Sequence, residues 1–106
     1  AGFDSHERDQ TAGQRVTSDG FGRLAALLFD AADRLCGGRV VLVLEGGYDL
    51  DGLRESIINV LDAAIEPGRW LVPPPALQGK LELVIDALTE LHAPYWPVLR
   101  QKLGKR

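Results

Sequence analysis

Two short stretches of this sequence hold side chains suited to metal binding and to hydrogen bonding with a ligand. The first, AGFDSHERD at residues 1–9, crowds four acidic or imidazole side chains into six positions: Asp4, His6, Glu7 and Asp9. Carboxylates and imidazoles are common ligands of metal ions in proteins. The second, EGGYDL at residues 45–50, presents the phenol of Tyr48 behind two glycines, which let a neighbouring group approach the backbone closely.

Each stretch alone also fits a purely structural interpretation. A charged loop with one histidine is usually solvated, and the other histidine of the sequence, His92, comes late in a helical pattern where it suits the helix dipole. Glycine-rich turns commonly follow strands, whether or not they contain a tyrosine. A phosphate-binding loop is disfavoured, because the sequence has neither a GxGxxG motif nor a lysine in P-loop spacing.

The second stretch directly follows a predicted strand and lies between two predicted helices. RVVLVL, residues 39–44, is apolar at every position after the arginine, as in a central strand of a parallel sheet that helices cover. Apolar residues recur every three or four positions on both sides of it. The candidate helix ends are Thr17 or Ser18 and Gly37-Gly38 for the first helix, and Asp49 or Asp51 for the start of the second. Ligands bind beyond the carboxyl ends of parallel strands, which is where Tyr48 lies.

The whole chain is predicted to form one domain of the α/β class. Its 106 residues are 45% hydrophobic and 25% charged, which is typical of one soluble globular domain. The pattern predicts four parts: a candidate active-site loop (1–16), a helix–strand–helix unit (17–66), a proline-rich connector (67–78), and a terminal helix with a tail (79–106). The terminal helix is expected to end before Pro94, which cannot continue it.

Composition disfavours several classes of partner. The formal net charge is −3, so the chain lacks the basic footprint of a protein that binds nucleic acid or an anionic membrane surface. Its apolar runs are too short to cross a membrane. The single cysteine, Cys36, cannot form an internal disulfide and suits a reducing compartment. We therefore expect a cytoplasmic protein that binds neither nucleic acid nor membranes.

Three blocks of the sequence, AGFDSHERD, TSDGF and RVVLVLEGGYDL, occur in a distinctive order and spacing. Together they resemble the zinc-dependent histone deacetylase family, including its bacterial acetoin-utilisation and acetylpolyamine amidohydrolase relatives. The tail ELHAPYWPVL resembles the end of the bacterial members. The resemblance is strongest over residues 1–65 and covers only the C-terminal portion of the family's domain. It implies the C-terminal part of an arginase/deacetylase-like parallel-sheet fold, here helix-rich with one clear buried strand.

The resemblance implies roles for four residues of the two stretches. Asp4 matches one of the family's aspartate zinc ligands. Tyr48 matches the tyrosine that donates a hydrogen bond to the acetyl oxygen as that oxygen becomes an oxyanion. Gly46 and Gly47 support the loop that carries this tyrosine, because glycine permits the backbone angles and close approach that the turn needs.

The sequence also departs from the family pattern. The family usually has proline and leucine where this chain has Gln10 and Thr11, so Thr11 is expected to make the wall of the substrate channel more polar. His6 and Asp9 match motif positions, and we assign them to loop structure before catalysis. The family's Asp-x-His zinc pair and its two adjacent catalytic histidines have no counterpart in these residues.

These matches imply function at two levels. The parent protein is expected to be a zinc-dependent deacetylase that hydrolyses acetyl-lysine or an acetylated small amine. The 106-residue chain alone is expected to be an inactive fragment, because the other zinc ligands and the general base are missing. The alternative is a non-catalytic interaction or self-association module that pairs through exposed edges of the 39–44 strand. A hydrolase or nucleotide-binding piece of another α/β fold ranks last, because nucleophile-elbow and phosphate-loop motifs are missing.

Overall fold

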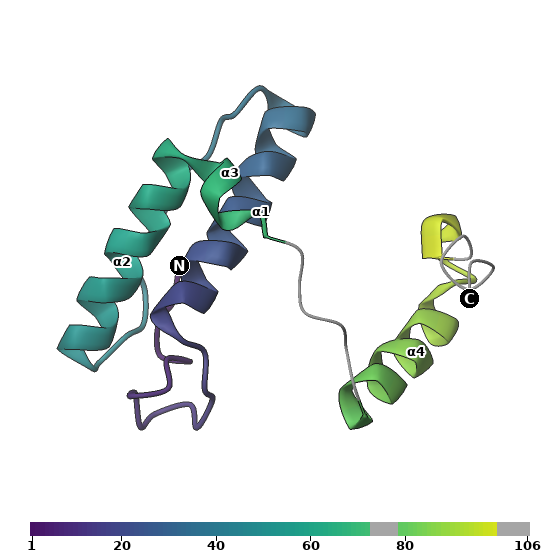
Figure 1. The fold of residues 1–106 in the computed structure, drawn as a ribbon, viewed down its shortest axis with the longest axis horizontal. Helices are drawn as coiled ribbons and strands as arrows, with labels where there is room; N and C mark the ends of the chain where they lie inside the picture. Colours follow the sequence, from purple (N-terminus) through teal and green to yellow (C-terminus); the bar gives the residue numbers. More distant parts are fainter. Residues whose placement is uncertain (73–78, 100–106) are drawn as a thin grey trace. The chain divides into compact units, whose positions relative to one another are not determined.

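Helices make up most of the regular structure in this chain (Figure 1). The computed structural model describes residues 1–72 and 79–99. The helices in chain order are α1 (Ser18–Cys36), α2 (Leu50–Ile65), α3 (Pro67–Trp70) and α4 (Lys80–His92). The chain divides into two compact units, residues 1–72 and 73–106, and every candidate site residue belongs to the first.

Side-chain caps begin both long helices of the first unit where the sequence predicts them. Thr17 Oγ1 accepts a hydrogen bond from the backbone N–H of Gly20 at 3.0 Å, and Asp49 Oδ1 accepts one from Gly52 at 2.6 Å. Each cap satisfies an N–H group that has no acceptor within its own helix. Gly37 caps the C-terminal end of α1, and its φ of 63° lies in the left-handed region that favours glycine. These predicted helix ends are confirmed.

A small core forms where α1 and α2 pack against each other and against the first residues of the chain (Figure 1). The buried hydrophobic residues of this cluster are Phe3, Phe21, Ala25, Ala26, Val60 and Ala63. The rings of Phe3 and Phe21 lie 4.9 Å apart between centroids and are tilted by 55°, an arrangement that aromatic pairs prefer. Alanines at the helix contact allow the two helices to approach closely. Phe3 therefore ties the loop that carries Asp4 to the helix pair.

The segment predicted as a buried strand, residues 39–44, runs from α1 to α2 beside the first residues of the chain. The amino group of Ala1 donates to the Val43 carbonyl, and the Ala1 carbonyl accepts from the N–H of Glu45 at 3.0 Å, as in a parallel pair. No strand is assigned within residues 1–72 and 79–99, and Val41 is 89% exposed. Alternate side chains line hollows against the helices: Val40, Leu42 and Leu44. Burial of this strand stays a prediction.

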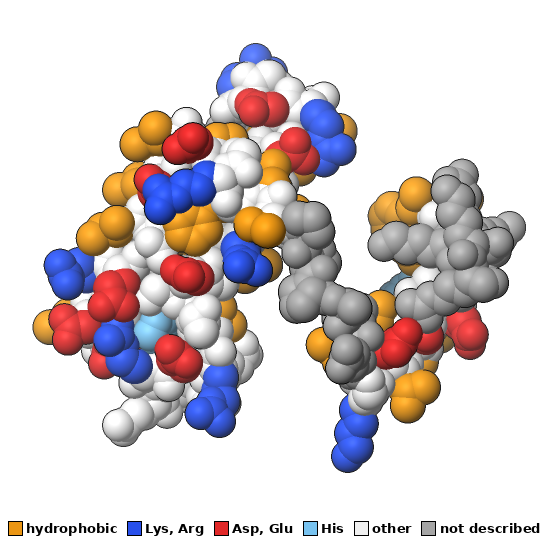
Figure 2. All heavy atoms as spheres, in the orientation of Figure 1, with side chains coloured by type: hydrophobic (Ala, Val, Ile, Leu, Met, Phe, Trp, Pro, Cys, Tyr) orange, Lys and Arg blue, Asp and Glu red, His pale blue; other side chains and the backbone are white. Residues whose placement is uncertain are grey.

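Hydrophobic side chains are also exposed on the two long helices of the first unit. Figure 2 shows them in orange along the outer side of α2. The large exposed side chains of α2 include Leu50, Ile58, Leu61 and Ile65. Apolar surface of this kind commonly marks a place where other protein packs, so it is consistent with a chain that has further contacts to make.

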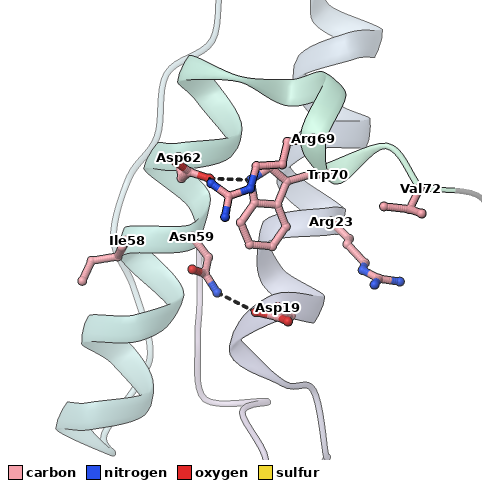
Figure 3. Close-up of a pocket in the computed structure, with 8 residues that line it drawn as sticks. All are labelled: Asp19, Arg23, Ile58, Asn59, Asp62, Arg69, Trp70 and Val72. Atoms are coloured by element: carbon pink, nitrogen blue, oxygen red, sulfur yellow. Dashed lines mark hydrogen bonds and ion pairs between the residues drawn. The ribbon is translucent and has the colours of Figure 1, made fainter.

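The segment predicted as a proline-rich connector (67–78) begins with a one-turn helix, α3, that the sequence pattern does not predict. Pro67 occupies the first helical position, where its missing N–H is no loss. Trp70 Nε1 donates to Asp62 Oδ2 at 2.8 Å, and the Arg69 guanidinium contacts the same oxygen at 3.2 Å (Figure 3). These contacts fix the indole beside a hollow of about 420 Å³ that α1, α2 and α3 line. Residues 73–78 of the predicted connector lie outside the described residues.

Trp70 packs directly over Gly22 of α1, which leads to a testable prediction. A Cβ at Gly22 would stand 2.4 Å from Cζ3 of the indole, so Gly22→Ala must displace the ring. Alanine gains about 1 kcal/mol of helix propensity. Overpacking typically costs about 1–3 kcal/mol. Displacing the indole in the Gly22→Ala protein would also weaken the Trp70–Asp62 hydrogen bond. We expect a net loss of about 1–2 kcal/mol in the free energy of unfolding, measured by urea denaturation.

The control for this substitution is Gly68→Ala in α3, where a Cβ meets nothing within 4 Å. It should leave stability unchanged or raise it slightly, because alanine is the better helix former. A Gly22→Ala protein as stable as the wild type would show that the indole is not fixed over this glycine.

The second unit contains the predicted terminal helix, α4. Its apolar positions recur at helical spacing and are partly to largely exposed: Leu81, Val84, Ile85, Leu88 and Leu91. α4 ends at His92, two residues before Pro94, as predicted. The tail beyond residue 99 lies outside the described residues. The helices that are described fall short of the length and apolarity that a membrane crossing requires.

Candidate functional site

Backbone hydrogen bonds hold the first 16 residues in a closed loop. His6 N–H donates to the Phe3 carbonyl at 3.1 Å, and Asp9 N–H donates to the His6 carbonyl at 2.9 Å. A parallel bridge between His6 and Val16 joins the two arms of the loop. The loop is therefore built to present its side chains in fixed directions, although it contains no helix.

The structure brings Asp4 to the glycine turn of the second stretch. Phe3 N–H donates to the Gly46 carbonyl at 2.7 Å, so the loop runs beside the end of the 39–44 segment. A Cβ at Gly46 would lie 2.9 Å from Asp4 Oδ1, and one at Gly2 would lie 3.1 Å from the same oxygen. The carboxylate thus sits between two glycines that leave room for it. Within the described residues it has no hydrogen-bond partner, so it remains available to a ligand.

Gly47 is required for a different reason. Its φ is 132°, a conformation that side chains other than glycine rarely adopt. A Cβ there would also lie 3.0 Å from Cβ of Phe3 and 3.1 Å from Cδ1 of Leu53. The first glycine therefore leaves space for Asp4, and the second provides the backbone angle and the tight packing of the turn.

Tyr48 follows the turn with its backbone anchored and its side chain exposed. Its N–H donates to Asp9 Oδ2 at 2.7 Å, and the next N–H, of Asp49, donates to the same oxygen at 3.3 Å. The side chain is 70% exposed. It lines a hollow of about 260 Å³ together with Arg8, Asp9, Gln10, Thr11 and Asp49. The structure therefore brings Tyr48 and Thr11 to one hollow, and Asp4 is not among the described residues that line it.

Thr11 uses both of its donors on Asp9. Its backbone N–H donates to Asp9 Oδ1 at 2.9 Å, and its hydroxyl donates to the same oxygen. The hydroxyl of Thr11, followed by the backbone N–H groups of Tyr48 and Thr11, lowers the pKa of Asp9 to about 2. Asp9 therefore holds the loop and the turn together, which agrees with its assignment to loop structure. The expected place of Thr11 on the substrate channel stays a prediction.

The lowered pKa of Asp9 predicts a pH dependence of stability. A carboxylate whose pKa falls on folding stabilises the folded state above its unfolded pKa, here 3.8, and loses that contribution as the pH falls to about 2. The difference in stability between the wild type and Asp9→Asn should thus be constant above about pH 4 and shrink between pH 4 and 2. Urea denaturation across this range measures it. A difference that does not change with pH would exclude the ionised Asp9 as its source.

His6 lies in a buried network that joins the loop to both long helices. Its Nδ1 accepts a hydrogen bond from the Arg8 N–H at 3.1 Å, so Nε2 carries the proton and donates to Ser18 Oγ at 2.9 Å. Ser18 Oγ donates in turn to Glu55 Oε2 at 3.2 Å, which also pairs with Arg8 at 2.7 Å. The ring is 2% exposed and stacks on Phe21. Both nitrogens are engaged, so His6 is structural here.

The sequence gives no signal for the partners in this network. Ser18 and Glu55 lie 12 and 49 positions after His6, and each also fits an ordinary helix surface position. A Cβ at Gly52 would lie 2.6 Å from His6 Nδ1, so the histidine also depends on a glycine of α2. Such pairs become visible only once the helices are packed.

The described residues do not form a complete metal site. Within residues 1–72 and 79–99, no group of three or more His, Cys, Asp or Glu side chains is placed to bind one ion. His6 and Asp9 use their ligand atoms in hydrogen bonds, and of the four candidate ligands Asp4 is the carboxylate that lies beside the Gly46 turn. Zinc sites in enzymes use three protein ligands. These residues therefore do not fit a zinc ion unaided.

Comparison with known proteins identifies the family. The profile of the histone deacetylase domain matches residues 1–64. The chain is 34% identical over 108 residues to human polyamine deacetylase HDAC10, covering 96% of this chain and 15% of that protein. It is 46% identical over 80 residues to the histone deacetylase-like amidohydrolase of Pseudomonas aeruginosa, covering 62% and 21%. It is 33% identical over 105 residues to Arabidopsis thaliana histone deacetylase 5, covering 98% and 15%.

This chain belongs to the histone deacetylase family. The predicted family is confirmed, and the matched range agrees with the region where the sequence resemblance is strongest. The chain spans about 15% of the length of the human and the Arabidopsis thaliana relatives.

Proposed function

We propose that this chain supplies part of the active site of a deacetylase that hydrolyses acetyl amides. The observation that carries the proposal is the packing of Asp4 against Gly46, two residues before Tyr48. Two stretches that are separate in the sequence, residues 1–9 and 45–50, thus meet at the end of the 39–44 segment. We call the longer protein to which we assign this chain the parent deacetylase.

In this proposal Tyr48 acts on the acetyl group. When water adds to the amide carbonyl, the carbonyl oxygen gains negative charge, and the phenol O–H donates a hydrogen bond to it. A donor of this kind is typically worth about 3 kcal/mol of the barrier. Support comes from the exposure of the phenol, which leaves it open to a substrate, and from the anchored backbone behind it.

Zinc dependence is a separate part of the proposal. It rests on the resemblance of Asp4 to a family zinc ligand, and the other ligands would come from parts of the parent deacetylase outside these residues. The free carboxylate of Asp4, held between Gly2 and Gly46, is suited to complete such a set. The 106-residue chain alone is accordingly expected to bind zinc weakly and to lack turnover.

We infer the substrate class from the relatives. The similar human protein is named a polyamine deacetylase and the Pseudomonas aeruginosa protein an amidohydrolase, so an acetylated amine or acetyl-lysine is the favoured substrate. The polar hydroxyl of Thr11 beside the hollow of Tyr48 is consistent with a substrate that carries polar groups near the reacting amide.

The isolated chain provides the experiment for this proposal. The purified 106-residue chain, after incubation with zinc and dialysis, is assayed for metal content and for hydrolysis of an acetyl-lysine reporter. We expect metal at background level and no turnover, with activity found only in the parent deacetylase. Stoichiometric zinc together with turnover by the isolated chain would overturn this division of the site.

A second candidate function is self-association through the 39–44 segment. Val41 is 89% exposed and Val43 is 62% exposed, so this segment presents an apolar face to solvent. In this alternative the chain is a non-catalytic module that pairs with another copy. Light scattering after size exclusion measures its mass, and a monodisperse monomer across the micromolar range would exclude this candidate.

A further inference from the structure

Asp9 accepts four hydrogen bonds, two from within its own loop and two from the turn that precedes α2. Its Oδ1 accepts from the N–H and the hydroxyl of Thr11, and its Oδ2 accepts from the N–H groups of Tyr48 and Asp49. Asp9 is 5% exposed, so these bonds replace the water that the carboxylate would otherwise bind. A buried carboxylate with this set of donors connects two segments rigidly, because Asp9 binds Tyr48 and Asp49, which lie 39 and 40 positions further along the chain.

We propose that Asp9 is a positioning residue for Tyr48, and that Thr11 holds Asp9 in place for this purpose. The proposal rests on the proposed function, in which the Tyr48 phenol contacts the reacting acetyl group. Asp9 itself does not contact the substrate in this arrangement. It fixes the backbone from which the phenol is presented.

The need for such an anchor follows from the surroundings of Tyr48. Gly46 and Gly47 precede it, and glycine loses more conformational freedom on folding than any other residue. The phenol is 70% exposed, so packing does little to fix its position. The backbone N–H of Tyr48, bound to Asp9 at 2.7 Å, therefore directly constrains where the side chain begins.

Thr11 contributes a side-chain donor that an apolar residue cannot. A leucine at this position would keep its backbone N–H but would lack the hydroxyl that donates to Asp9 Oδ1. Charge-assisted hydrogen bonds of this type are short and strong. The hydroxyl of Thr11 therefore strengthens the Asp9 anchor.

The first test measures the anchor itself in the 106-residue chain. Hydrogen exchange of the Tyr48 amide, followed by NMR, should become about tenfold faster or more in Asp9→Asn, because the ionised acceptor is lost. The matched control is Glu7→Gln, which removes an exposed carboxylate from the same loop and should leave this amide unchanged. Equal exchange of the Tyr48 amide in the wild type and Asp9→Asn overturns the proposal.

The second test is a double-mutant cycle in the parent deacetylase. Asp9→Asn should lower kcat by about 10- to 100-fold with little change in KM, since a misplaced oxyanion donor weakens only the transition state. In a Tyr48→Phe background the same substitution should have no further effect, because the hydroxyl that it positions is gone. If Asp9→Asn lowers kcat by the same factor in the Tyr48→Phe background as in the wild type, the proposal is overturned, since Asp9 would then act by another route.

Thr11 variants keep the proposal testable even if Asp9→Asn does not fold. Thr11→Val removes the hydroxyl and should lower kcat by a few-fold. Thr11→Ser keeps a hydroxyl donor and should have the kcat of the wild type. A Thr11→Val protein with unchanged kcat and an unchanged Tyr48 amide contradicts the role of Thr11. If the wild-type parent hydrolyses no acetyl amide, the proposed function fails, and the exchange of the Tyr48 amide still decides whether Asp9 anchors the turn.

Discussion

Replacing Tyr48 by phenylalanine is expected to lower kcat of the parent deacetylase for an acetyl amide by about 10²–10³-fold. The substitution removes one hydroxyl, and the proposed role of that hydroxyl is to stabilise the oxyanion formed from the acetyl carbonyl. Because the interaction strengthens as charge develops, the loss should appear in kcat more than in KM. Steady-state kinetics with an acetyl-lysine reporter and an acetylated alkylamine measures both.

This substitution should leave the fold unchanged. The Tyr48 side chain is 70% exposed, and its anchoring hydrogen bond comes from the backbone N–H, which phenylalanine keeps. Tyr95→Phe is the matched control, because it removes an equivalent exposed hydroxyl from the second unit and should retain full activity. Wild-type kcat in Tyr48→Phe, with the control also active, would exclude the phenol from the reaction.

Gly46→Ala is expected to lower kcat/KM of the parent deacetylase on the order of 10²-fold while changing stability little. The added Cβ would lie 2.9 Å from Oδ1 and 3.0 Å from Cγ of Asp4, so the carboxylate must move. Moving the end of a side chain costs little free energy of unfolding. Displacing a group of a catalytic site by about 1 Å, however, can lower activity on the order of 10²-fold.

Three measurements separate these effects. Urea denaturation reports stability, steady-state kinetics reports kcat/KM, and metal analysis reports zinc content. Gly68→Ala serves as the control, because a methyl group there meets nothing within 4 Å and the site is elsewhere in the first unit. An active Gly46→Ala enzyme with normal zinc content would mean that the position of Asp4 is not critical.

The sequence was most informative where one local rule decides the structure. Thr17, Asp49 and Gly37 mark helix ends because capping depends on a side chain and the N–H or C=O groups next to it. The break before Pro94 follows from the geometry of proline in the same way. The family was also identifiable from sequence, since its motifs are short and contiguous.

The sequence was least informative where residues far apart meet. Two contacts depend on how α1, α2 and α3 pack. One is Trp70 against Gly22, and the other is the hydrogen-bonded series His6–Ser18–Glu55. Neither contact has a local pattern in the sequence. The motif assigns Asp9 to the loop, but its bond to Tyr48 has no local pattern because the two residues are 39 positions apart. The 39–44 strand is predicted from its apolar pattern, but burial of a strand depends on neighbours on both faces, which a local pattern cannot specify.

The most direct test asks whether Asp4 and Tyr48 serve one active site. It measures the zinc content and the turnover of the parent deacetylase for Asp4→Ala and Tyr48→Phe side by side. If Asp4 is a zinc ligand and Tyr48 is the oxyanion donor, Asp4→Ala loses both zinc and turnover, whereas Tyr48→Phe keeps its zinc and loses turnover. An Asp4→Ala protein that retains one zinc per molecule and wild-type turnover would contradict the claim that Asp4 belongs to the active site.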